Sequence, residues 1–206
     1  NPPIVTATRV SSTIKIDGKL DDQDWSRAEP ITEFFKREPR QGGEYLYDTE
    51  AKILYDEKNL YVGVFCKDSL GRKGIRVQDL RRDFNGFEND AFQIALDPQN
   101  LKQYCVSFHT TPYGNQRDLQ NFNDSNTDND WNALWSVRTH RTDSGYYAEF
   151  AIPFKSIRYE ETQLGEEPTW GLTMSRLARR DFESTSFPAI PLSFSPYRMT
   201  YAAELR

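Results

Sequence analysis

The amino-acid sequence predicts an all-β protein, an antiparallel β-sandwich with one or two short helices. Three observations support this fold class. Apolar residues recur mainly with a period of two rather than 3.6. Turn sequences such as Asp17-Gly18 and Ser144-Gly145 separate short, strand-length runs, which is typical of sandwiches and barrels. Aromatic residues make up 14% of the chain, too large a share for a disordered protein.

The alternation also predicts where the strands lie. A hairpin is expected because two strand-like runs flank a polar turn at 57–59. The expected strands are 51–56, 60–66, 91–96, 103–109, 146–152 and 170–175, with weaker ones at 137–141 and 199–205. Short helical turns are expected at 21–28, capped by Asp21 or Asp22, and at 154–157. Since no stretch is typical of a linker, one domain over 1–206 is predicted.

Composition and short motifs exclude several classes of function. Lys and Arg number 26 against 31 Asp and Glu, a net charge of −5, which argues against binding to nucleic acid. No apolar run reaches the roughly 18 residues of a membrane-spanning helix. The start at Asn1 has no signal-peptide pattern and indicates a processed or trimmed product. Cys66 and Cys105 are too few for a four-cysteine zinc site, so they either pair or fill the core.

The sequence contains no recognisable catalytic motif. There is no nucleophile elbow, phosphate loop or dinucleotide fingerprint, and His109 and His140 lack the spacing of a catalytic zinc site. A glycoside hydrolase would need a pair of carboxylates, and no particular pair stands out. The sequence therefore predicts a protein that is not an enzyme.

Several expected strands carry small or polar residues opposite their apolar ones. These residues are Ala91, Gln93, Ala95, Ser107, Glu149, Ala151, Thr173 and Ser175. Small side chains on a twisted sheet leave a shallow trough, and polar ones line it with donors and acceptors for a ligand rich in hydroxyl groups. The alternative is a face that is simply solvated or covered by loops, as one face of an antiparallel sheet commonly is.

An acidic segment carries side-chain oxygens on every second residue, at Asp124, Asn126, Asp128 and Asp130. Calcium binds six to eight oxygens, and calcium loops use this spacing, so the segment is a candidate metal site with calcium as a structural cofactor. It departs from such loops because no glycine stands at the sixth position and Trp135 occupies the twelfth. A solvated polar turn is the alternative.

Three segments, at 16–25, 54–63 and 89–97, resemble in their order and spacing the carbohydrate-binding module of family nine, and 147–154 and 170–173 agree. The resemblance implies a β-sandwich that binds the ends of sugar chains, often with structural calcium, for which Asp68 and Asp90 are further candidate ligands.

Further segments, among them 130–135 and 152–158, resemble a subgroup found at the front of exported proteins of Bacteroidetes-type bacteria, whose remainder resembles an outer-membrane barrel. This resemblance implies export to the periplasm, outer membrane or cell surface of a Gram-negative bacterium, with a C-terminal barrel domain as partner.

The family's sugar-binding positions carry over to four residues. Phe87 stands where the family has a stacking Trp, Gln93 where it has an acidic hydroxyl-binding residue, and Ser107 at a polar position. Tyr197 falls near the second stacking Trp. The resemblance thus implies Phe87 and Tyr197 as platforms and Gln93 and Ser107 as hydroxyl partners.

The predicted function is that of a non-catalytic domain of an exported bacterial protein, holding a saccharide, such as an oligosaccharide end, on a polar sheet face. One alternative is a structural or protein-docking N-terminal domain of an outer-membrane protein without affinity for sugar. The second is a domain associated with a glycoside hydrolase. The sequence does not name the sugar.

Overall fold

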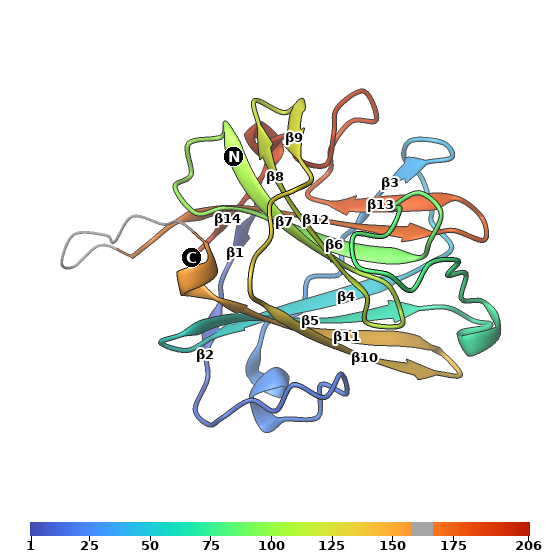
Figure 1. Ribbon diagram of the computed structural model, residues 1–206, viewed down its shortest axis with the longest axis horizontal. Coiled ribbons are helices and arrows are strands. Elements are labelled where there is room, and N and C mark those ends of the chain that lie inside the picture. Colours follow the sequence, from blue (N-terminus) through green and yellow to red (C-terminus); the bar gives the residue numbers. More distant parts are fainter. Residues whose placement is uncertain (158–166) are drawn as a thin grey trace.

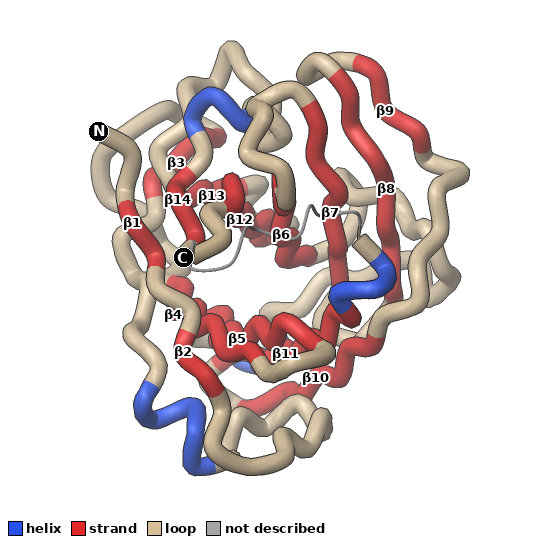
Figure 2. The backbone as a smooth tube through the Cα atoms, turned by 90° about the vertical axis from the view of Figure 1, so that its left-hand side faces the viewer, coloured by secondary structure: helices blue, strands red, loops and turns tan. Residues whose placement is uncertain are grey.

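In the computed structural model, which describes residues 1–157 and 167–206, two β-sheets pack face to face (Figures 1 and 2). The first sheet runs, in spatial order, β1 (Ile4–Val5), β14 (Ala203–Leu205), β12 (Trp170–Ala178), β6 (Ala91–Asp97), β7 (Tyr104–Thr110), β8 (Gln116–Phe122) and β9 (Asn126–Asp128). Two further strands extend it beside β12, namely β13 (Glu183–Phe187) and then β3 (Phe35–Glu38).

The second sheet runs β10 (Ser136–Thr142), β11 (Gly145–Pro153), β5 (Asn59–Lys67), β4 (Thr49–Tyr55) and β2 (Thr8–Arg9). The helical turns are short and of the 3₁₀ type: η1 (Gln23–Arg27), η2 (Gly71–Lys73), η3 (Phe154–Ser156) and η4 (Met199–Tyr201). Within the described residues, no helix has the length and apolar character needed to cross a membrane.

The all-β sandwich is confirmed, together with the β4–β5 hairpin and the predicted strands, except for the one expected at 199–205. There, Met199–Tyr201 form η4 and only Ala203–Leu205 form a strand. Neighbouring strands are antiparallel except in two short pairs, β1 with β14 and β2 with β4, which are parallel. The sequence missed β8 and β13, since both are rich in polar residues and lack a clear apolar alternation.

The expected cap of the first helical turn needs correction. Asp22 precedes η1, but its carboxylate does not cap the helix and instead accepts the Lys15 N–H at 2.9 Å. Asp21 is not the cap residue either.

The structure also decides between the two alternatives for the cysteines. Cys66 and Cys105 are both free and buried, on β5 and β7 of different sheets, so they fill space rather than pair.

The core lies between the two sheets. Phe150 on β11 stacks on Trp135 with ring centroids 5.8 Å apart, and the edge of Phe92 on β6 meets Phe150 at 6.1 Å. Phe108 on β7 packs edge-on against Trp135 at 5.2 Å. Because aromatic rings bury large areas and these rings come from both sheets, this cluster joins the two layers.

Residues 10–28, which include η1, cover the outer face of the second sheet (Figure 1). Trp25 is only 2% exposed there, and Gly63 makes room for it, since a Cβ at Gly63 would lie 2.8 Å from the indole. Glu149 is buried beneath this segment and accepts hydrogen bonds from the Asp17 N–H at 3.0 Å and the Trp25 indole N–H at 3.2 Å. Glu149 and its strand neighbour Ala151 therefore do not belong to the predicted polar trough, because β11 lies in the other sheet.

Replacement of Phe150 by Ala should destabilise the whole sandwich. Its ring is fully buried between Trp135 and Phe92, so its removal leaves a cavity that costs about 3–5 kcal/mol of unfolding free energy. Urea denaturation followed by tryptophan fluorescence measures this loss. Phe122→Ala is the control, since Phe122 is 42% exposed and should cost far less. Equal losses in the two variants would contradict the central place of Phe150.

Glu149 should make stability depend on pH. Burial raises the pKa of its carboxyl from 4.5 to about 7 in the fold. Between these values the folded protein binds more protons than the unfolded chain, so the unfolding free energy falls as pH rises. In Glu149→Gln, that fall should shrink by up to about 3 kcal/mol. Urea denaturation at about pH 5 and about pH 8 tests this, and parallel curves for the two proteins would contradict it.

Candidate functional site

A row of polar side chains crosses the outer face of the first sheet. The strand register places Ser175 of β12 opposite Gln93 of β6, Gln93 opposite His109 of β7, and His109 opposite Arg117 of β8. Because side chains directly opposite each other share one face of a sheet, these four residues form a continuous line across four strands. We call these four residues the polar row.

The polar row lies in a cleft with a volume of about 580 Å³. Two segments form its walls. Phe87, from the loop before β6, is 72% exposed, and Tyr197, from the segment between β13 and η4, is half-buried. The cleft thus combines a polar floor with aromatic side chains on its walls.

Hydrogen bonding on the floor leaves some polar atoms available. The Tyr197 hydroxyl donates to Gln93 Oε1 at 3.4 Å, while the Gln93 amide nitrogen has no acceptor among the described residues. His109 pairs through Nε2 with the Ser107 hydroxyl at 2.8 Å. Burial and the neighbouring Arg117 lower the pKa of His109 to about 3, so its ring is neutral at physiological pH. Burial raises the pKa of Tyr197 to about 12, so its hydroxyl keeps its proton.

The wall that carries Tyr197 is held from two sides. The guanidinium of Arg37 on β3 donates to the carbonyl oxygens of Ile190, at 3.3 Å, and of Phe194. From below, the Thr173 hydroxyl donates to the Pro196 carbonyl at 2.8 Å. These bonds satisfy carbonyl groups of a loop and fix its position over the sheet.

The wall that carries Phe87 is organised by Asn89, which is fully buried. Its side-chain oxygen accepts the N–H groups of Gln78 at 2.6 Å and Asp79 at 3.2 Å, and its amide donates to the Asn85 carbonyl at 2.8 Å. The side-chain oxygen of Asn85 in turn accepts a hydrogen bond from the Phe87 N–H at 2.8 Å. One buried amide therefore determines the path of the loop that presents Phe87.

The structure brings three of the four predicted sugar-binding residues together, since Phe87, Gln93 and Tyr197 all line the cleft. Ser107 does not line it: its side chain lies on the same face of β7 as His109, but it is fully buried and bonded to His109. The roles of these residues in binding stay predictions. Sequence reasoning missed Arg117, because it lies on the polar strand β8, where no apolar alternation indicates a strand.

The predicted calcium segment forms the hairpin of β8 and β9. Asn126 and Asp128 lie on exposed β9, and Asp124 lies in the turn with a φ of 64°, which aspartate tolerates. Asp124 forms an ion pair with Arg198 at 2.9 Å, and Asp128 accepts the Asp130 N–H at 3.0 Å. This hairpin turn matches the alternative of a solvated polar turn better than a metal loop.

The other two candidate calcium ligands have protein partners. Arg180 donates to both oxygens of Asp68 at 3.0 Å, and Asp90 accepts the N–H groups of Arg76 at 2.8 Å and Arg179 at 2.6 Å. Among the described residues, no three His, Cys, Asp or Glu side chains are placed to hold a metal. Calcium binding by this chain stays a prediction.

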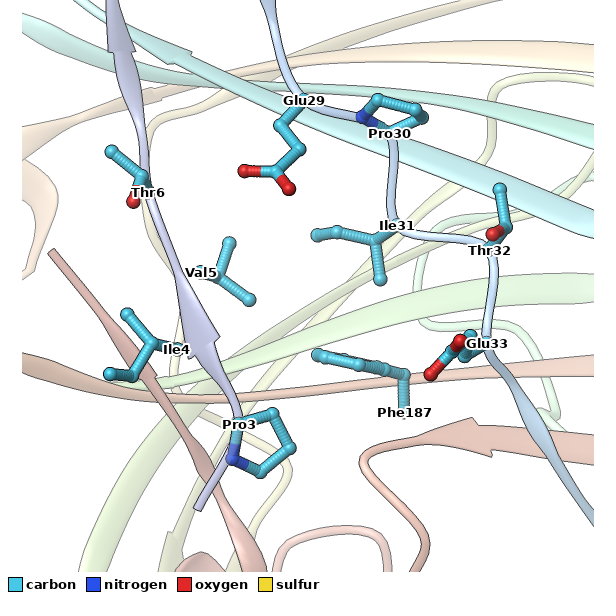
Figure 3. A pocket seen from close by; sticks show the side chains of 10 residues that line it. All are labelled: Pro3, Ile4, Val5, Thr6, Glu29, Pro30, Ile31, Thr32, Glu33 and Phe187. Carbon is cyan, nitrogen blue, oxygen red and sulfur yellow. The ribbon is translucent and has the colours of Figure 1, made fainter. Parts of the chain in front are cut away.

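A second, smaller cavity of about 300 Å³ lies between β1 and residues 29–33, with Phe187 beside it (Figure 3). Its carboxylates, Glu29 and Glu33, stand apart along this segment with Ile31 between them (Figure 3). None of the predicted site residues lines this cavity. The cleft on the first sheet is therefore the candidate functional site.

Comparison with known proteins places this architecture in a family. Residues 16–176 match the model described as carbohydrate family 9 binding domain-like. The chain is 30% identical over 160 residues to exoglucanase XynX of Acetivibrio thermocellus and 31% identical over 153 residues to endo-1,4-beta-xylanase A of Thermoanaerobacterium saccharolyticum. These matches cover 75% and 73% of this chain but only 13% and 12% of those enzymes.

Solved structures show the same fold at low sequence identity. A family 9 carbohydrate binding module from Caldicellulosiruptor kristjanssonii in complex with cellotriose aligns with a TM-score of 0.67 at 13% identity, covering 100% of this chain and 93% of that one. A candidate carbohydrate-binding protein from Bacteroides uniformis aligns with a TM-score of 0.72 at 8% identity, covering 100% and 99%. With the family match spanning most of its length, the chain belongs to the carbohydrate family 9 binding domain-like family.

Proposed function

We propose that this chain is a non-catalytic carbohydrate-binding module that holds a saccharide in the cleft of the first sheet. The observation that carries the proposal is the polar row beneath two aromatic side chains, Phe87 and Tyr197. The family membership supports it, as does the bound sugar in the family 9 modules from Caldicellulosiruptor kristjanssonii, cellotriose in one and glucose in another.

The chemistry of a sugar matches that of the cleft. The C–H face of a pyranose is apolar and stacks on an aromatic ring, while its hydroxyls need new partners when water is displaced. Phe87 offers an exposed ring, and the Gln93 amide and the Arg117 guanidinium offer donors. Because hydrogen bonds hold both walls in place, little ordering of the protein is required on binding.

The carboxylates of the cleft support a binding role rather than hydrolysis. Glycoside hydrolysis uses two carboxyl groups about 5–10 Å apart. Among the described residues that line the cleft, Glu38 is the one carboxylate, and it accepts a hydrogen bond from the Ser184 hydroxyl at 2.9 Å.

The protein-docking alternative is less well supported. A docking domain would use exposed arginines, such as those near 82 and 180, to contact a partner domain. Arg82 is instead paired with buried Asp118 at 2.6 Å, and Arg180 with buried Asp68 at 3.0 Å. These two cations stabilise loops of the domain itself.

We also propose that the module works outside the cytoplasm of a Gram-negative bacterium, as part of a longer protein. The resemblance of its sequence to the front domains of exported proteins supports this proposal. The match covers only 12–13% of the length of the xylan- and glucan-degrading relatives, which supports the proposal that the module is part of a longer protein.

Phe87→Ala should weaken sugar binding about five- to tenfold, because the stacking platform is lost. Isothermal titration of the full chain with glucose, cellotriose and a panel of other oligosaccharides measures the change. Phe65→Ala is the matched control, since Phe65 stacks on Tyr147 in the other sheet at 4.5 Å. Absence of binding heat for every sugar at millimolar concentration would refute the proposal.

Asn89→Ala should also weaken binding although Asn89 itself does not line the cleft. Loss of its three hydrogen bonds should free the loop that presents Phe87, at a local cost of about 1–3 kcal/mol. Hydrogen exchange at the Gln78 and Asp79 amides should speed up together with the loss of affinity. The exposed Asn126→Ala change is the control, and unaltered exchange at 78 and 79 would show that Asn89 does not position this loop.

A further inference from the structure

We propose that the saccharide bound by this cleft is acidic, and that the Arg117 guanidinium holds its negatively charged group, a ring carboxylate or a sulfate ester. The inference rests on the proposed function and specifies its ligand class. Three features support it: the position of Arg117, its lack of an anionic partner and the charge of the cleft.

Arg117 stands where a bound sugar would meet it. It occupies one end of the polar row, opposite His109, and lines the cleft. Its Nη1 lies against the backbone of Gly86, since a Cβ at Gly86 would come within 2.7 Å of that atom. Gly86 directly precedes Phe87, so the guanidinium and the exposed ring of Phe87 belong to the same end of the cleft.

The positive charge of Arg117 is not neutralised within the protein. Among the described residues no carboxylate lies within ion-pairing distance, and its hydrogen bond to the Asn129 side-chain oxygen is long, at 3.4 Å. By contrast, Arg82 and Arg180 each bind a buried carboxylate. A half-buried guanidinium with free donors offers the planar fork that binds a carboxylate through two hydrogen bonds.

The cleft as a whole is positive in a protein that is negative. The chain has a net charge of −5, yet among the described residues the charged side chains at the cleft are Arg37, Arg117 and Glu38. Arg176 lines the cleft through its backbone only, because its guanidinium donates to the Asp48 and Lys67 carbonyls at the second sheet. Arg37 donates to neutral backbone carbonyls and lies next to Glu38, the one carboxylate among the described lining residues, so the charge of Arg117 is in excess. A concave site with an excess of positive charge attracts anionic ligands and favours them over neutral ones.

The sharpest test compares pairs of sugars that differ only in the charged group. The full chain is titrated calorimetrically with glucuronic acid against glucose, galacturonic acid against galactose, and glucose 6-sulfate against glucose. In at least one pair the charged sugar should bind about tenfold or more tightly than its neutral counterpart, as for a charge-assisted hydrogen-bonded pair. The pair that shows the preference identifies carboxylate or sulfate as the recognised group.

Arg117→Gln should bring this affinity ratio close to one, whereas Arg117→Lys should retain part of it through charge alone. Arg72→Gln is the matched control: it removes one positive charge from an exposed residue beside the second sheet and should keep the ratio. Raising the salt from about 20 mM to about 500 mM should reduce the preference. Circular dichroism of each variant checks that the sandwich is retained.

Two results would overturn the inference. One is equal affinity for the charged and neutral members of every pair, and the other is a preference that survives in Arg117→Gln. Either result with measurable binding of neutral sugars leaves the proposed carbohydrate-binding function intact. Absence of binding for every sugar overturns both.

Discussion

The pleat of β6 couples the core of this protein to its cleft. Phe92, Ile94 and Leu96 are completely buried between the sheets, so the residues between them must project from the opposite face. Those residues include Gln93, which lies at the centre of the polar row. A slip of one position in the pairing of β6 would place polar groups in the core and phenylalanine on the surface. Packing of the sandwich therefore fixes the floor of the binding site.

Arginine side chains position the elements around that floor. Arg37 holds the segment that carries Tyr197 through backbone carbonyls, and Arg82 ties the loop that carries Phe87 to buried Asp118 on β8. Arg198 binds Asp124 and so joins the β8–β9 hairpin to the same segment as Tyr197. Each of these cations has a partner that satisfies it. Arg117 differs because it points into the cleft without an anion, which makes it available to a ligand.

The sandwich fold by itself does not determine which ligand a member binds. The structural relatives share the sandwich at 8–13% identity, so most of its side chains can differ while the fold is kept. The ligand class proposed for this chain depends instead on particular side chains of the cleft, the Phe87 ring and the Arg117 guanidinium on β8. Four of the carboxylates predicted as calcium ligands, namely Asp68, Asp90, Asp124 and Asp128, have a donor or a cation within the protein.

Period-two alternation was enough to predict the all-β class, the β4–β5 hairpin and most long strands, because apolar side chains on one face of a strand must be buried. The resemblance of short segments to a family then pointed to Phe87, Gln93 and Tyr197. Only the tertiary structure showed that Glu149 belongs to the other sheet, that Ser107 is buried beside His109, and that Arg117 completes the polar row. Alternation tells which side of its own strand a residue occupies, whereas the choice of sheet, the register between strands and the covering loops arise from contacts between distant segments.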